Sequence, residues 1–188
     1  ETLYTPTELS VRIGWYDLTT GERMTVADDQ TYLNIGQVSI PQQTNDAGIP
    51  NPVNLNFGDL IELVGYDVSM LTAAPGDAVT LTLYWRALQP VPDDYVVFAN
   101  IIDPQTLRKV ADSNAMPANW QRPTSSWAVG EIVEDQHTLS VYADAEAGIY
   151  TIETGLYLQQ DGFPRLRLRE DSGLLGQDFA HLTRVRVR

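Results

Sequence analysis

Apolar and polar residues alternate along most of this chain, and the alternation near its start matches that near its end. Alternation with a period of two places one set of side chains on one face of a β-strand. Each copy has a long alternating run, a turn that contains glycine, a short alternating run and a closing strand. In the first copy, the four parts are Leu9, Val11, Ile13 and Trp15; the turn Thr20-Gly21; Met24 and Val26; and Val38 and Ile40. In the second copy, the same four parts are Tyr150, Ile152, Thr154 and Leu156; the turn Asp161-Gly162; Leu166 and Leu168; and Val185 and Val187.

This internal repeat sets the expected domain organisation, because repetition decides how many units a chain contains. Residues 1–40 are predicted to be a partial repeat, the three closing strands of a preceding sandwich. Residues 41–52 are rich in proline, asparagine and glutamine and read as a linker. Residues 53–188 are predicted to form a complete β-sandwich domain.

The same patterning predicts the fold class of residues 53–188. Turn signals such as Pro75-Gly76-Asp77 separate short strands at regular spacing, and no stretch sustains a helical period. We therefore expect an all-β fold, an antiparallel immunoglobulin-like or jelly-roll sandwich with almost no helix. The expected strands are 59–67, 78–87, 94–102, 107–112, 131–141, 148–158, 163–169 and 180–188.

The alternation also predicts which residues form the core. Val79, Leu81, Leu83 and Trp85 share one strand face, and the nearly continuous apolar run in 95–102 is typical of a central strand covered on both sides. Trp15 and Trp85 both lie on faces expected to point inward.

The apolar face of the first copy lacks a partner sheet of its own. Each such side chain gains roughly 1.5–3 kcal/mol on full burial, and three isolated strands are not stable with that face in water. We expect residues 1–40 to cover the main domain, to pair with a second copy in a homodimer, or to remain disordered.

Composition narrows the classes of partner. The 188 residues carry a net charge of −13 with a pI near 4.3, which argues against nucleic acid. The absence of cysteine excludes disulfides and thiolate metal sites. No apolar run approaches the ~20 residues that span a bilayer. Because the chain opens on Glu1, we expect it to be a fragment of a longer protein.

Arginines alternate with apolar residues on the last two predicted strands. Arg165, Arg167, Arg169, Arg184, Arg186 and Arg188 would form a polar face that pairs with acids such as Glu170 and Asp171. The alternative is a site for an anionic ligand.

An ordered set of short motifs carries a family resemblance. It runs from Phe57-Gly58-Asp59 through Pro75-Gly76-Asp77 and Asp103-Pro104 to Gly148-Ile149-Tyr150 and Gly155-Leu156-Tyr157. Over residues 53–188 this order resembles the tandem extracytoplasmic β-sandwich domain of bacterial polytopic membrane proteins that are similar to the protein-mannosyltransferase-like glycosyltransferases. The resemblance implies a noncatalytic accessory domain outside the cytoplasm, attached to the rest of a membrane protein. The catalytic acids of that family have no counterpart here.

The residue types themselves predict no catalytic centre and no cofactor. Nucleophilic catalysis needs a nucleophile, a base and an orienting group that converge. The two histidines, His137 and His181, have no nucleophile elbow to serve. No zinc site is expected, and Asp93 with Asp94 are the first candidates for a structural calcium ion.

A glycan is the ligand that the sequence favours. The 112–129 loop combines a candidate platform, Trp120, with polar groups that can bond sugar hydroxyls, namely Asp112, Asn119, Gln121 and Arg122. Trp127, in contrast, looks like an anchor of the loop against the sheet. Two alternatives stay open: a carbohydrate-binding module that uses this loop, and a structural spacer or assembly domain.

Overall fold

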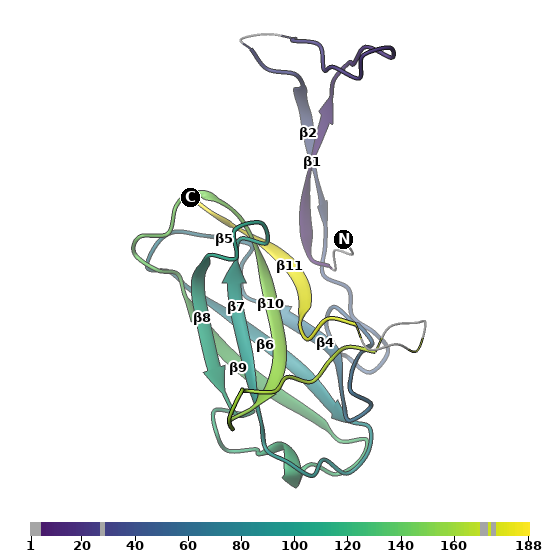
Figure 1. Ribbon diagram of the computed structural model, residues 1–188, viewed down its shortest axis with the longest axis vertical. Helices are drawn as coiled ribbons and strands as arrows, with labels where there is room; N and C mark the ends of the chain where they lie inside the picture. Colours follow the sequence, from purple (N-terminus) through teal and green to yellow (C-terminus); the bar gives the residue numbers. More distant parts are fainter. Residues whose placement is uncertain (1–4, 27–28, 170–172, 174–175) are drawn as a thin grey trace.

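The computed structural model describes residues 5–26, 29–169, 173 and 176–188, and they form a β-sandwich with a long ribbon attached (Figure 1). One sheet has five strands, in the order β5 (Thr72–Ala73), β11 (Ala180–Val187), β10 (Gly148–Leu158), β7 (Tyr95–Ile102) and β8 (Lys109–Ala115). The other has four, in the order β3 (Leu55–Phe57), β4 (Ile61–Val68), β6 (Ala78–Ala87) and β9 (Ile132–Ser140). All neighbours in the two sheets are antiparallel except β11 and β5. The predicted all-β sandwich is confirmed.

Strand positions follow the sequence pattern closely where strands are long. β6 and β10 have the predicted bounds of 78–87 and 148–158. The strand predicted at 163–169 is wrong, since the described part of this segment forms no strand and makes isolated bridges such as Tyr157↔Arg165 and Phe57↔Leu168. Phe163 has a φ of 44°, and Pro164 has no N–H to donate to a ladder. β3 and β5 were not predicted, because three or two residues are too few to show a period.

The core lies between the two sheets and contains the predicted face of β6. Leu81, Leu83 and Trp85 are fully buried, and the Trp85 ring meets Phe57 edge-on with ring centroids 5.8 Å apart. Ile152 and Leu156 of β10 face them from the opposite sheet within the same cluster. Within the described part of the chain, no helix is long and apolar enough to cross a bilayer.

The first copy of the repeat forms a two-stranded ribbon that extends away from the sandwich (Figure 1). β1 (Thr7–Ile13) pairs with β2 (Leu33–Ile40), and the ribbon is held at its base. There the Tyr66 hydroxyl donates to the Thr5 carbonyl, and the Thr183 hydroxyl donates to the Pro6 carbonyl. The third strand expected near Met24 is not formed by the described residues.

The apolar face of the ribbon does not cover the main domain. Trp15 is 52% exposed, so its assignment to the core is wrong, and Leu9, Val11 and Ile13 also face solvent. The sequence pattern is a strand pattern, but burial requires a second sheet, and the described residues supply none for this face.

The repeat extends to the register of strand pairing. Leu9↔Val38 and Ile13↔Leu33 in the ribbon match Tyr150↔Val185 and Thr154↔Ala180 in the sandwich. Both pairs shift register at the equivalent point, before Arg12 in β1 and before Glu153 in β10. The bridge Tyr16↔Arg23 likewise corresponds to Tyr157↔Arg165. The ribbon therefore has the pairing of β10 and β11 without the β7 neighbour that β10 has in the sandwich.

Candidate functional site

The strongest candidate site lies on the outer face of the five-stranded sheet. Val97, Ala99 and Ile101 of β7 belong to the core, so the alternate residues Phe98 and Asn100 face the other way. Each of these two is nonetheless only 2% exposed. The segment that follows β10 contributes to this cover, since the Arg165 guanidinium lies 4.5 Å from the centre of the Phe98 ring.

A row of polar side chains crosses this face. The register places Asp112 of β8, Asn100 of β7, Glu153 of β10 and His181 of β11 side by side. Asn100 Nδ2 donates to Glu153 Oε1 at 3.1 Å, and His181 Nε2 lies 3.6 Å from Glu153 Oε2. Asn100 Oδ1 is buried and accepts no hydrogen bond from the described residues. A buried acceptor without a donor costs about 1–3 kcal/mol, so this oxygen is an unsatisfied point in the middle of the row.

Aromatic rings form the neighbouring wall of the site. Tyr157 stands 6.5 Å from Phe98 and 6.0 Å from Phe163, measured between ring centroids. Phe163 is 60% exposed and lies at the rim of this site. Together these groups enclose a cavity of about 280 Å³, lined by Phe98, Asn100, Lys109, Asn114, Tyr157, Phe163 and Arg165.

Gly155 makes this packing sterically feasible. A Cβ atom at this position would lie 2.6 Å from the Phe98 ring and 2.9 Å from the Asp178 carbonyl oxygen. Gly155 pairs directly with Phe98 across β10 and β7, so the ring lies over the strand where no side chain stands. The site thus depends on the glycine that the sequence analysis used only as part of a motif.

The site residues predicted from the sequence lie in two different places in the structure. Asp112 joins the outer-face row, where its carboxylate accepts hydrogen bonds from Asn114 Nδ2 at 3.3 Å and from the Tyr142 hydroxyl. Asn119, Trp120, Gln121 and Arg122 instead lie in the turn that follows β8. Asp112 and these four residues are thus not gathered into the single site that the sequence suggested.

The turn holds Trp120 at the surface in a strained backbone. Ala118, Asn119 and Trp120 all have positive φ, at 52°, 51° and 70°, which costs energy for residues other than glycine. Trp120 is 50% exposed. Arg122 is engaged with Glu131 at 2.6 Å, and the predicted anchor role of Trp127 is confirmed by its burial and by its indole N–H bond to the Arg122 carbonyl at 3.1 Å.

A buried network fixes this turn to the sandwich. Asp135 is fully buried and accepts bonds from Ala118 N at 2.9 Å and Trp85 Nε1 at 3.3 Å. Its Oδ2 also lies 2.9 Å from His137 Nε2, and His137 Nδ1 lies 3.0 Å from Ser113 Oγ. Ser113, Asn119 and His137 line a second cavity of about 550 Å³. The polar groups satisfy one another, so the network explains how the turn is held.

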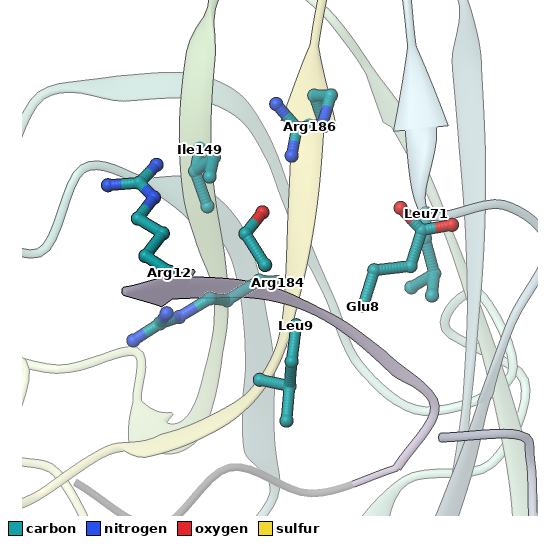
Figure 2. A pocket seen from close by; sticks show the side chains of 8 residues that line it. Glu8, Leu9, Arg12, Leu71, Ile149, Arg184 and Arg186 are labelled. Atoms are coloured by element: carbon teal, nitrogen blue, oxygen red, sulfur yellow. The ribbon is translucent and has the colours of Figure 1, made fainter. Parts of the chain in front are cut away.

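A third cleft lies between the ribbon and the sandwich. Figure 2 shows Arg12 of β1 and Arg184 and Arg186 of β11 around it, with Glu8 on the opposite side from Arg12. Its volume is about 350 Å³, and the Arg12 guanidinium stacks on Tyr32 at 4.3 Å. The anionic site predicted for the arginines remains a prediction.

The other predicted arginine partners can be placed only in part. Arg165 lies 3.5 Å from Asp178, and Arg169 Nε donates to Asp59 at 2.7 Å, so two of these arginines pair with acids. The suggested partners Glu170 and Asp171 lie outside the described residues.

The calcium candidates serve as loop acceptors in the structure. The Asp93 carbonyl accepts from the Thr124 hydroxyl at 2.7 Å, and Asp94 Oδ1 accepts from Ser125 N at 3.1 Å. Among the described residues, no group of three or more histidine, cysteine, aspartate or glutamate side chains could hold a metal ion.

Tyr142, which bonds Asp112 at the edge of the outer-face site, has a raised pKa that a titration can detect. The hydrogen bond to Asp112, with burial and the nearby carboxylate charges of Asp112 and Asp144, raises the pKa of Tyr142 from 10.0 to about 12. Because the folded state favours the neutral phenol, this contact stabilises the fold fully below pH 10 and is lost as the pH rises through about 12. We expect Tyr142→Phe to remove a step near pH 12 from the ultraviolet tyrosine titration. An unchanged titration curve would contradict the bond to Asp112.

The two central residues of the outer face, Asn100 and Glu153, are not among the site residues predicted from the sequence. A signal was present, since each is a polar residue within a run that is otherwise apolar or small, 95–102 and 148–158. Buried polar groups of this kind require a partner, and the sequence does not show which strands bring the partners together.

Comparison with known proteins finds a partial likeness among solved structures. The described strands define an antiparallel β-sandwich of five and four strands. A solved structure similar to it is titled "Crystal structure of the C-terminal domain of wzt", with 13% sequence identity, a TM-score of 0.46, and coverage of 71% of this chain and 75% of that one. No family model matches the sequence, and no curated protein matches it.

Proposed function

We propose that this chain is a noncatalytic carbohydrate-binding accessory domain that takes its glycan on the outer face of the five-stranded sheet. The observation that carries the proposal is Asn100, a buried amide whose oxygen accepts no hydrogen bond from the described residues and which bonds the buried carboxylate of Glu153. Asn100 lines an aromatic cavity, and the exposed ring of Phe163 lines it as well.

The chemistry of this site fits a sugar ring. Hydroxyl groups can donate to Asn100 Oδ1 and accept from Asn114 or Lys109, which line the same cavity. The apolar face of the ring can pack on Phe163 or Tyr157, as aromatic side chains do in sugar sites.

The accessory role and the place outside the cytoplasm rest on the sequence resemblance described above. In that proposal the domain is attached to a membrane-associated, glycosyltransferase-like protein and presents or retains its glycan. The described residues contain a hydrogen-bonded histidine network, but its groups bond one another and pin a turn, which supports a binding domain over an enzyme.

The test is isothermal titration calorimetry against a panel of bacterial envelope glycans, with two matched aromatic variants. Phe163→Ala removes an exposed ring from the outer-face site, and we expect it to weaken binding roughly ten-fold, since such a contact contributes about 1–1.5 kcal/mol. Trp120→Ala removes an equally exposed ring from the 116–122 turn and should leave affinity unchanged.

The two variants also separate the two sugar sites. Loss of binding in Trp120→Ala with full binding in Phe163→Ala would overturn the outer-face site and favour the loop. If no glycan in the panel binds the unsubstituted protein, the carbohydrate proposal fails.

A structural spacer or assembly domain is the second candidate, and one observation favours it. The ribbon carries an apolar face in solvent and is bonded to the sandwich at its base, which is a plausible arrangement for joining one folded unit to another.

A further inference from the structure

The ribbon has a free strand edge next to its apolar face. β1 and β2 form a sheet of two strands only, so among the described residues β1 pairs on one side alone. The register-equivalent strand in the sandwich, β10, uses this other side to pair antiparallel with β7 from Thr151 to Leu158. An unpaired edge of this kind presents backbone donors and acceptors to another strand.

The sequence of β1 is complementary to itself about its central residue. β1 runs from Thr7 to Ile13, so its midpoint is Ser10. An antiparallel pair centred there would set Glu8 opposite Arg12 twice, Leu9 opposite Val11 twice, and Ser10 opposite Ser10. Opposite charges and apolar residues that face one another directly stabilise a strand pair, whereas like charges destabilise it.

We propose that two copies of this chain associate through antiparallel pairing of their β1 strands about a two-fold axis at Ser10. The result is a four-stranded sheet in the order β2, β1, β1, β2, with both apolar faces on one side. The interface is isologous, so each Glu8–Arg12 pair occurs twice. A second copy fits this edge because the charge pattern of β1 complements itself.

Charge reversal tests the register directly. Glu8→Arg sets arginine against Arg12 of the other copy, and Arg12→Glu sets glutamate against Glu8, so each single variant should shift from dimer to monomer in sedimentation velocity. The double variant Glu8→Arg/Arg12→Glu restores opposite charges and should dimerise again. An equimolar mixture of the two single variants should form a heterodimer.

Arg12 also stacks on Tyr32, so the rescue by the double variant is the decisive comparison. If the unsubstituted chain remains a monomer at its highest soluble concentration, or if the double variant stays as monomeric as the singles, the proposed pairing is overturned.

A single cysteine provides an independent test, because the chain contains none. Cβ atoms of directly opposed residues lie about 4.5–5.5 Å apart in antiparallel strands, close to the reach of a disulfide. Ser10→Cys should therefore form a covalent dimer under mild oxidation. Gln37→Cys, which carries the thiol on β2 opposite Ser10, is the matched control and should cross-link far more slowly. Equal or faster cross-linking through Gln37→Cys would overturn the register.

Discussion

Asp135→Ala is expected to lower the free energy of unfolding by about 3–5 kcal/mol, the largest loss among the substitutions considered. The carboxylate is fully buried and serves three groups at once: Ala118 N, Trp85 Nε1 and His137 Nε2. Truncation removes the acceptor of all three groups, and it leaves a cavity beside Trp85. Urea denaturation followed by tryptophan fluorescence measures the loss.

The matched control is Gln136→Ala, on the same strand but with its side chain exposed. We expect it to change stability by no more than about 0.5 kcal/mol. Because Asp135 also anchors the turn through Ala118 N, amide exchange in 116–122 should accelerate in Asp135→Ala and not in the control. Equal stability of the two variants would contradict the role given to the network.

Gly155→Ala is expected to cost about 1–3 kcal/mol and to abolish glycan binding at the outer face. The added Cβ would lie 2.6 Å from the Phe98 ring, which has to move, and 2.9 Å from a backbone oxygen of Asp178, which has little freedom to do so. Displacement of Phe98 disturbs both the aromatic wall and the adjacent Asn100.

Gly36→Ala is the matched control for that substitution. Gly36 also lies in a strand, β2, and a Cβ there would meet nothing within 4 Å. It should leave stability and binding unchanged. Thermal unfolding and calorimetry of the two variants measure both effects, and a Gly155→Ala protein that binds normally would show that the packing over Phe98 is not part of the site.

The sequence predicts a strand well where its position is set by a pattern within the strand itself, and poorly where it is set by contacts with distant segments. Long strands such as β6 and β10 were predicted with correct bounds, because alternation over ten or eleven residues is visible in the sequence itself. The segment 163–169 also alternates, but its bridges to Tyr157 and Phe57 come from two different strands and do not form a ladder. Alternation therefore predicts a strand at 163–169, where the structure has an irregular segment that lies over Phe98 through Arg165.

The tryptophans show the same distinction. Trp85 and Trp15 both continue an apolar alternation in the sequence, yet Trp85 is buried by an opposing sheet and Trp15 lies beyond the end of β1 and is exposed. Trp120, the candidate platform of the loop, is 50% exposed, and its role in sugar binding stays a prediction.

The outer-face site could not have been assembled from the sequence. Asn100 and Glu153 are 53 residues apart, and their contact arises from the register of β7 against β10. Asp112 was named in advance for a different loop site, and Arg165 was named for a site on the arginine face. A polar residue within a buried run was the available signal, and its meaning depends on strand order.

The most direct test of the account is a ¹⁵N-resolved NMR titration of this chain with the tightest-binding glycan of the panel. We expect the largest shifts at the side-chain amides of Asn100 and Asn114 and at the backbone amides of β7 and β10 around Phe98 and Gly155. Shifts confined to the Trp120 indole and the 116–122 turn would place the sugar on the loop and contradict the outer-face site.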